Sequence, residues 1–243
     1  MKDIVSAVAY AKEQAAIDDA SIYLVGTPKE KKMEIACLDF EGVLVPEIWI
    51  NVAERTGIEA LRATTRDIPD YDVLMHQRLG ILDEHQLGLP DIQAVIADMG
   101  PLKGAQEFLG WLQARFQVIL LSDTFYEFAA PLLQQLGYPV MLCHRLEVAQ
   151  DGRVTGYRLR QADSKRMAVK AFHNLNFCVI ATGDSYNDTT MLSEADIGIL
   201  FCPPDNVVAE FPQFPVASNY DQLREAFSDA SNRLKALPED PAT

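Results

Sequence analysis

Two short apolar runs, each ending on an aspartate, constrain the fold of this chain more than any other feature of its sequence. One covers residues 35–38 and leads to Asp39, and the other covers residues 179–183 and leads to Asp184. A short apolar run bounded by turn-forming residues is typical of a strand buried on both faces of a parallel sheet. Ligands of open α/β sheets bind beyond the carboxyl ends of such strands. We therefore expect the two aspartates to lie close together at that edge of one sheet.

Further carboxylates follow both aspartates. Glu41 comes shortly after Asp39, and Asp188 comes shortly after Asp184. So many carboxylates at one place repel one another unless a cation lies among them. Hard oxygen ligands of this kind suit Mg²⁺. The sequence therefore predicts a magnesium site at this edge, although each acidic residue taken alone would be interpreted as a solvated loop carboxylate.

The segments around these aspartates resemble the first and fourth motifs of the haloacid dehalogenase-like phosphohydrolases, whose first motif is usually Asp-x-Asp-Gly-Thr/Val. They read DFEGVLV from Asp39 and GDSYND around Asp184. Ser122 ends an apolar run, as the Ser/Thr of the second motif does, and Lys165 opens a helical stretch, as the lysine of the third motif does. The presence of all four motifs in order favours functional roles over an ordinary helix cap for Ser122 and a surface position for Lys165.

Longer stretches are similar to one branch of that superfamily, the bacterial bifunctional family of phosphoserine phosphatase and phosphoserine:homoserine phosphotransferase. They read DFEGVLVPE, DVLMHQRL, LSDTFYEF, GYRLRQADSKR and GDSYNDTTMLSEA, and the resemblance extends from Met33 to about Leu234. It implies a magnesium-dependent enzyme of serine and threonine biosynthesis that transfers a phosphoryl group from phosphoserine to water or to homoserine. The alternatives are a phosphatase for another small phosphomonoester and a non-catalytic phosphate- or metal-binding protein.

The resemblance implies catalytic roles for three of these residues. Asp39 would be the nucleophile that forms an aspartyl-phosphate, which divides one difficult displacement into two easier ones. Lys165 would neutralise Asp39 and the phosphoryl oxygens as a point charge. Glu41, where the superfamily commonly has aspartate, would protonate the leaving alkoxide and deprotonate the incoming water or alcohol. Because glutamate is longer than aspartate, we expect a site rebuilt around Glu41, and we hypothesise that the longer acid favours an alcohol acceptor.

The resemblance also implies ligands for the metal. Mg²⁺ would contact a carboxylate oxygen of Asp39, the backbone carbonyl of Glu41 and the carboxylate of Asp184. Asp188 would support the site directly or through water.

The resemblance further implies residues that bind the substrate. Ser122 and Asp123 would bind the phosphoryl group, Ser122 through its hydroxyl and the neighbouring backbone N–H groups, and Lys165 would add its charge. Glu47 would meet the amino group of phosphoserine. Arg78 would bind the carboxylate, because its guanidinium can bond bidentately. The alternative for both residues is ordinary surface charge. For Glu47 this alternative is as well supported as substrate binding, whereas for Arg78 it is less well supported than substrate binding.

Charge and cysteine content bear on partners and compartment. The formal net charge of −14 argues against binding to nucleic acid or to anionic membranes. No apolar run reaches the length needed to cross a bilayer. The cysteines form no C-x-x-C pair, and those in predicted strands would be small hydrophobes. With no secretory signal, these features predict a cytoplasmic protein whose partners are small-molecule substrates. They do not predict an oligomeric state.

Alternating strand and helix patterns predict an α/β fold with a Rossmann-like parallel sheet. We expect its core to comprise residues 33–45 and 101–237, with a small helical cap at 46–100 inserted after the first strand. Residues 1–32 have no counterpart in the resembling family. They are either an N-terminal extension or sequence upstream of a start at Met33, and we expect no role for them in the chemistry. Residues 238–243 are predicted to be a frayed tail.

Local signals place a few elements more closely. The Asp151-Gly152 pair predicts a hairpin turn. Asp163 or Ser164 is expected to cap the helix that carries Lys165. Residues 139–142 are expected to form a short separate strand.

Overall fold

The computed structural model describes residues 33–64, 67–68 and 70–236. The predicted extension at 1–32 and the predicted tail at 238–243 lie outside the described residues, as does the last residue of the predicted core. The described strands form one seven-stranded sheet in the order β4-β3-β2-β1-β5-β6-β7. They are β1 (Met33–Leu38), β2 (Gln117–Phe125), β3 (Met141–Val148), β4 (Val154–Arg158), β5 (Phe177–Gly183), β6 (Ile197–Phe201) and β7 (Val216–Ala217).

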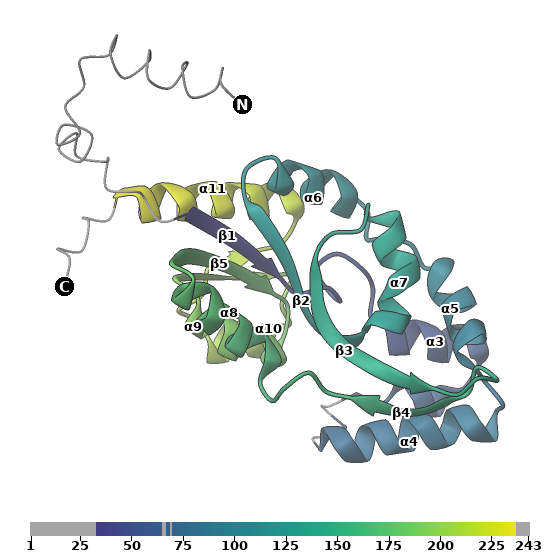
Figure 1. Cartoon of the computed structure of the whole chain (residues 1–243). Helices are drawn as coiled ribbons and strands as arrows, with labels where there is room; N and C mark the ends of the chain where they lie inside the picture. Colours follow the sequence, from purple (N-terminus) through teal and green to yellow (C-terminus); the bar gives the residue numbers. More distant parts are fainter. Residues whose placement is uncertain (1–32, 65–66, 69, 237–243) are drawn as a thin grey trace, which may run out of the picture. The chain divides into compact units, whose positions relative to one another are not determined.

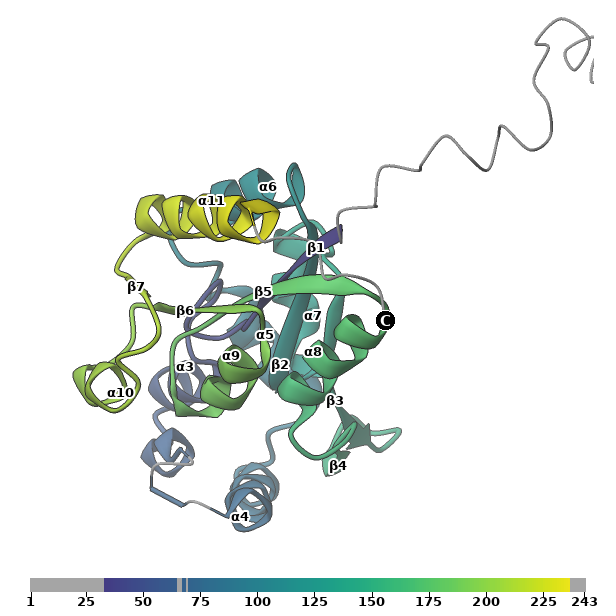
Figure 2. The same cartoon turned by 90° about the vertical axis from the view of Figure 1, so that its left-hand side faces the viewer.

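Neighbouring strands run parallel, apart from the antiparallel hairpin of β3 and β4. This arrangement confirms the predicted α/β fold with a Rossmann-like parallel sheet. Helices cover both faces: α6 and α11 lie on one side of the sheet and α8 and α9 on the other (Figure 1, Figure 2). Helix α6 (Ala105–Gln113) directly precedes β2. The helices that follow β2 are α7 (Tyr126–Gln135), α8 (Ser164–Asn174), the short 3-10 helix η2 (Tyr186–Asp188), α9 (Thr189–Glu194), α10 (Asp205–Glu210) and α11 (Tyr220–Ala236).

The central strand β1 shows why its sequence is apolar without a break. Successive side chains of a strand point to opposite faces. Ala36 and Leu38 pack in the hydrophobic cluster on the α6 and α11 side, whereas Ile35 and Cys37 pack in the cluster on the α8 and α9 side. Burial raises the pKa of the Cys37 thiol far above its ordinary value. Cys37 therefore behaves as a small core hydrophobe.

The chain between β1 and β2 is helical where the structure describes it. It contains α3 (Ile48–Thr56), the 3-10 helix η1 (Glu59–Arg62), α4 (Tyr71–Glu84) and α5 (Leu89–Ala97). These helices agree with the helical composition expected of the cap. In Figure 1, α4 lies alongside β4, and α5 packs against α7. The inserted segment is thereby held against β4 and α7.

Several local expectations differ from the structure. The strand expected at 139–142 begins at Met141 and continues as the first strand of the hairpin. Asp163 occupies the N-cap position of α8, but its side chain makes no capping bond, because its backbone is left-handed and its carboxylate bonds to Arg166 and Thr190. Neither α10 nor β7 was expected, since both are short and lack a periodic pattern.

Across the described part of the chain, none of the helices combines the length and apolar character that crossing a bilayer would require.

Candidate active site

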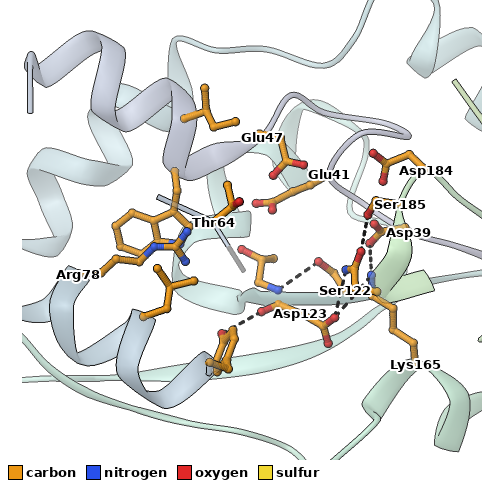
Figure 3. Close-up of a pocket in the computed structure, with 16 residues that line it drawn as sticks. Asp39, Glu41, Glu47, Thr64, Arg78, Ser122, Asp123, Lys165, Asp184 and Ser185 are labelled. Carbon is orange, nitrogen blue, oxygen red and sulfur yellow. Dashed lines mark hydrogen bonds and ion pairs between the residues drawn. The ribbon is translucent and has the colours of Figure 1, made fainter. Parts of the chain in front are cut away.

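A pocket of about 340 Å³ opens at the carboxyl ends of β1, β2 and β5 (Figure 3). It is lined by side chains from the strand ends, from the start of α8 and from the inserted helices. Among them are eight predicted site residues: Asp39, Glu41, Glu47, Arg78, Ser122, Asp123, Lys165 and Asp184. Asp188 is completely buried directly behind this lining. The fold thus brings together residues from the whole length of the core at one edge of the sheet.

Three carboxylates form a tight cluster. One oxygen each of Asp39, Asp184 and Asp188 lies within 4.8 Å of the others. Two glycines permit this approach. A Cβ on Gly42, whose φ is +74°, would lie 2.4 Å from Cγ of Asp184, and a Cβ on Gly183 would lie 2.3 Å from Cγ of Asp188. No residue with a side chain fits at either position without displacing a carboxylate.

The cluster is electrostatically incomplete without a cation. Burial, and next the Asp188 carboxylate, raise the pKa of Asp39 well above its ordinary value, although Lys165 opposes the shift. The same two causes raise the pKa of Asp184 to about 7. Because a divalent cation would relieve this repulsion, and carboxylate oxygens are its preferred ligands, the donor set fits such an ion.

Asp188 differs from its two neighbours because both of its oxygens already accept hydrogen bonds. Oδ1 accepts from Nζ of Lys165 at 2.7 Å, and Oδ2 accepts from the backbone N–H groups of Asp184 and Ser185. These bonds hold the loop that carries Asp184. Asp188 therefore supports the cluster from behind in addition to belonging to it.

Lys165 is a buried cation among carboxylates. It is the second residue of α8, its side chain is 2% exposed, and its Nζ lies 2.9 Å from Oδ1 of Asp39. Burial alone would lower the pKa of this ammonium, but Asp188, Asp39 and Asp123 together keep it well above the ordinary value. Lys165 is thus a permanent positive charge beside the strand-end aspartate.

Glu41 lies in the pocket apart from the three-carboxylate cluster. Its Oε1 is buried and has no hydrogen-bond partner among the described residues. Burial, and next the Glu47 carboxylate, raise the pKa of Glu41 to about 8, against the opposing charges of Arg78 and Lys165. Glu41 is therefore able to hold a proton near neutral pH, as an acid that protonates a leaving oxygen must.

Arg78 lies across the pocket from the strand-end aspartates (Figure 3). It is only 7% exposed, and its guanidinium carbon lies 4.5 Å from the ring centroid of Trp49. One Nη donates to the backbone carbonyl of Ala63 at 2.9 Å, while Nε has no partner among the described residues. Burial lowers the pKa of Arg78 to about 10. A surface position for this arginine is therefore excluded, and its charge is only partly compensated by the hydrogen bonds around it.

Glu47 immediately precedes α3 and makes no side-chain capping bond to that helix. Its carboxylate lies beside that of Glu41 in the pocket (Figure 3). Glu47 is exposed where it lines the pocket, so its position is compatible both with surface charge and with a role in binding substrate.

Ser122 is buried within β2, whose strand continues to Phe125 before α7 begins. The alternative role of Ser122 as a helix N-cap is therefore wrong, because Phe125 occupies that position. The start of α7 is also separated from Ser122 by the rest of the strand. The next residue, Asp123, faces the pocket with its side chain 37% exposed.

Several residues around this site have no signal in the sequence that marks them as site residues. Trp49 and Tyr71 line the pocket from the inserted helices, while His144 and Ser164 contact Asp123 from behind. The spacing of His144 from the other histidines does not indicate a metal ligand, so the sequence predicts only an ordinary polar role for it. Its buried place on β3 depends on the pairing of His144 with Phe125 across the β2–β3 ladder, which the local sequence does not determine.

The model of the haloacid dehalogenase-like hydrolases matches residues 36–193 of this chain. The chain belongs to this family. The phosphoserine phosphatase of Pseudomonas syringae pv. tomato is 66% identical over 208 residues, which cover 86% of this chain and 88% of that protein. The phosphoserine phosphatase ThrH of Pseudomonas aeruginosa is 65% identical over 205 residues, which cover 84% of this chain and all of that protein.

Solved structures share the fold of this haloacid dehalogenase-like hydrolase. A phosphoserine phosphatase in its apo form superposes with a TM-score of 0.65 at 21% identity, covering 81% of this chain and 98% of that one. A phospho-aspartyl intermediate analogue of phosphoserine phosphatase gives the same TM-score and identity, covering 82% of this chain and 99% of that one.

Proposed function

We propose that this hydrolase is a magnesium-dependent phosphoserine phosphatase that also transfers the phosphoryl group to homoserine, within serine and threonine metabolism. The observation that carries the proposal is the arrangement of one pocket. The Asp39 carboxylate lies against Lys165 on one side, and the buried Arg78 guanidinium lies on the other. A phosphate ester of an amino acid offers complementary groups to both. The names of the two relatives that are about two-thirds identical support the same substrate.

The chemistry proceeds in two displacements on the residues of this chain. A carboxylate oxygen of Asp39 attacks phosphorus, and the ester P–O bond breaks as Glu41 gives its proton to the leaving serine oxygen. In the second step Glu41 takes a proton from water or from the homoserine hydroxyl as that oxygen attacks phosphorus, and Asp39 leaves. Lys165 and Ser122, with the backbone N–H of Asp123, bind the phosphoryl oxygens through both steps.

Magnesium would be held by the carboxylates of Asp39 and Asp184 and by the backbone carbonyl of Glu41, with Asp188 supporting them. When bound, the ion would neutralise the negative charge shared by the carboxylates and the phosphoryl oxygens. The close three-carboxylate cluster and the raised pKa of Asp184 support this assignment. At the other end of the substrate, Arg78 would bind the carboxylate of phosphoserine and Glu47 its ammonium group.

Replacing Asp184 by alanine is expected to weaken magnesium binding before it affects anything else. Loss of one carboxylate leaves the ion with fewer ligands, and even changes to groups behind a metal ligand commonly cost about 10–100-fold in affinity. We therefore expect the Mg²⁺ concentration that gives half-maximal phosphoserine turnover to rise by at least about 10-fold. The titration is repeated without substrate by following the thermal unfolding midpoint, which a bound ion raises.

The matched control is Asp221→Asn on α11, whose side chain is 87% exposed. Its Mg²⁺ titration should overlay that of the unchanged protein in both measurements. An Asp184→Ala protein that titrates like the control would remove Asp184 from the metal site.

One assay tests the proposed function as a whole. Phosphoserine turnover is measured with and without homoserine, and both free phosphate and phosphohomoserine are quantified. We expect phosphate release that requires Mg²⁺, and its partial replacement by phosphohomoserine as homoserine is added. Phosphate release without any phosphohomoserine would reject the transfer activity alone. Turnover of other small phosphate esters in preference to phosphoserine would reject the substrate assignment.

A further inference from the structure

A cluster of polar side chains at the pocket wall contacts Lys165 from a side that the proposed mechanism does not use. At its centre is the carboxylate of Asp123. Its Oδ2 lies 3.6 Å from Nζ of Lys165, and its Oδ1 accepts a hydrogen bond from the hydroxyl of Ser164 at 3.1 Å. Nδ2 of Asn187 lies 3.4 Å from Oδ2. Asp123 is therefore held from both sides and is not a free pocket carboxylate.

His144 adds a third contact to this carboxylate. It is 4% exposed on β3, and its Nδ1 accepts a hydrogen bond from the backbone N–H of Arg160 at 3.1 Å. Because Nδ1 accepts, the ring proton is assigned to Nε2. That atom lies 3.6 Å from Oδ1 of Asp123. The imidazole thus presents its N–H to Asp123 and is fixed from behind by the chain that leads into α8.

The charge on Asp123 is well maintained. Burial opposes ionisation, but Lys165, His144 and Ser164 together hold the pKa of this carboxyl well below its usual range. An anion at this place repels a phosphate ester. The side chain of Asp123 is consequently unsuited to bind phosphoryl oxygens. Its backbone N–H is a hydrogen-bond donor and can still bind them.

We propose that Asp123 is a positioning residue for Lys165, held by His144 and Ser164, and that its side chain does not bind the substrate. The inference rests on the proposed phosphoryl-transfer function, in which Lys165 contacts the phosphoryl group. The ammonium of Lys165 has three N–H donors on a long flexible stem. Its two shorter contacts, 2.7 Å to Asp188 and 2.9 Å to Asp39, both go to the carboxylate cluster that fits a cation.

Asp123 differs from those two partners because it lies outside that cluster. When a cation and the substrate engage Asp39, the hold of that carboxylate on Lys165 weakens, whereas Asp123 keeps its charge and its place on β2. Oδ2 of Asp123 also lies farther from Nζ of Lys165 than the oxygens of Asp39 and Asp188 do. A contact of 3.6 Å attracts the ammonium electrostatically without saturating its third N–H, which remains available to a phosphoryl oxygen.

Asp123→Asn is the principal test, because it removes the charge and nearly keeps the shape. A displacement of a catalytic group by about 1 Å can cost roughly 100-fold in rate, so we expect kcat to fall by about 10–100-fold. KM should stay constant or fall, and inorganic phosphate should inhibit as strongly as before or more strongly, because a negative charge near the bound anion is gone. A side chain that bound the substrate would give the opposite sign, a raised KM and weaker inhibition by phosphate.

Variants of the supporting residues test the rest of the network. His144→Leu should lower kcat, though by less than Asp123→Asn does. His144→Gln should retain most of the activity lost in His144→Leu, because an amide can accept a hydrogen bond and donate one, as the imidazole does. Ser164→Ala should lower kcat by a few-fold with KM unchanged, and it keeps the test available if the other variants do not fold. Arg145→Gln is the control, since Arg145 lies next to His144 on β3 and its side chain is 69% exposed.

All variants are assayed with phosphoserine and with p-nitrophenyl phosphate, because Lys165 would act on the phosphoryl group of either. An unchanged protein that hydrolyses only the aryl ester would reject the phosphoserine assignment and leave the Asp123 effect measurable. Wild-type kcat in Asp123→Asn and Ser164→Ala would overturn the positioning role by itself. A raised KM at unchanged kcat in Asp123→Asn would overturn the positioning role in favour of substrate binding. If the unchanged protein turned over neither substrate, both the positioning role and the proposed function would be overturned.

Discussion

Asp39→Asn is expected to abolish phosphoserine turnover while leaving the fold intact. The amide is nearly isosteric with the carboxylate, and its carbonyl oxygen can still accept the two bonds that Oδ1 of Asp39 accepts, from the backbone N–H of Phe40 at 2.7 Å and from Lys165 at 2.9 Å. It cannot form an acyl phosphate. Loss of the nucleophile of a covalent enzyme costs on the order of 10⁶ in kcat, so we expect no turnover above background. The measurement is phosphate release at saturating phosphoserine and Mg²⁺.

Two further observations make that result specific to the covalent route. The unchanged protein is mixed with phosphoserine labelled on its phosphoryl group and quenched rapidly in acid. We expect the label to remain covalently on the protein and to be released by hydroxylamine, whereas Asp39→Asn should retain no label. The thermal unfolding midpoint should stay close to that of the unchanged protein, as in the exposed control Asp221→Asn. Wild-type turnover in a variant whose mass confirms the amide would show that Asp39 is not the nucleophile.

The parts of this site that could be predicted from sequence share one physical property. Asp39 and Asp184 each terminate a strand that is buried on both faces, and such strands are recognisable from an unbroken apolar run. The parallel pairing of the two strands, β1 and β5, then carries both aspartates to the same edge of the sheet, and the structure confirms the sheet. The opening position of Lys165 on α8 follows in the same way from a local helix signal.

The parts that could not be predicted depend on contacts between distant segments. His144 reaches Asp123 only because β3 pairs with β2 in one register and β4 then leads into α8. Trp49 covers Arg78 because the fold of the inserted segment brings the indole of α3 and the guanidinium of α4 together. Neither arrangement has a periodic or motif-like signal, since each needs the packing of two elements to be known first.

Arg78→Ala is expected to reduce the specificity constant for phosphoserine far more than that for phosphoethanolamine, which lacks the carboxylate. The guanidinium is almost fully buried, stacks on Trp49 and retains an Nε with no partner among the described residues. Loss of one partner from a desolvated charge pair costs about 2–5 kcal/mol, which corresponds to roughly 30-fold to several thousand-fold. An exposed pair would cost only about 0–1 kcal/mol. The effect should appear mainly in KM, because the Asp39 side of the pocket is unchanged.

The quantity that decides the matter is the ratio of kcat/KM for phosphoserine to kcat/KM for phosphoethanolamine, since both substrates share the phosphoryl and ammonium groups. A general distortion of the pocket by Arg78→Ala would lower both constants and leave the ratio in place. Arg78→Lys should recover only part of the ratio, because a point charge cannot bond the carboxylate bidentately or stack on Trp49 as the planar group does. Arg55→Ala in α3 is the matched control, since that side chain is 44% exposed in its pair with Asp98. If the ratio for Arg78→Ala equals the ratio for that control, Arg78 does not bind the carboxylate, and the pocket is then better explained as a site for small phosphate esters in general.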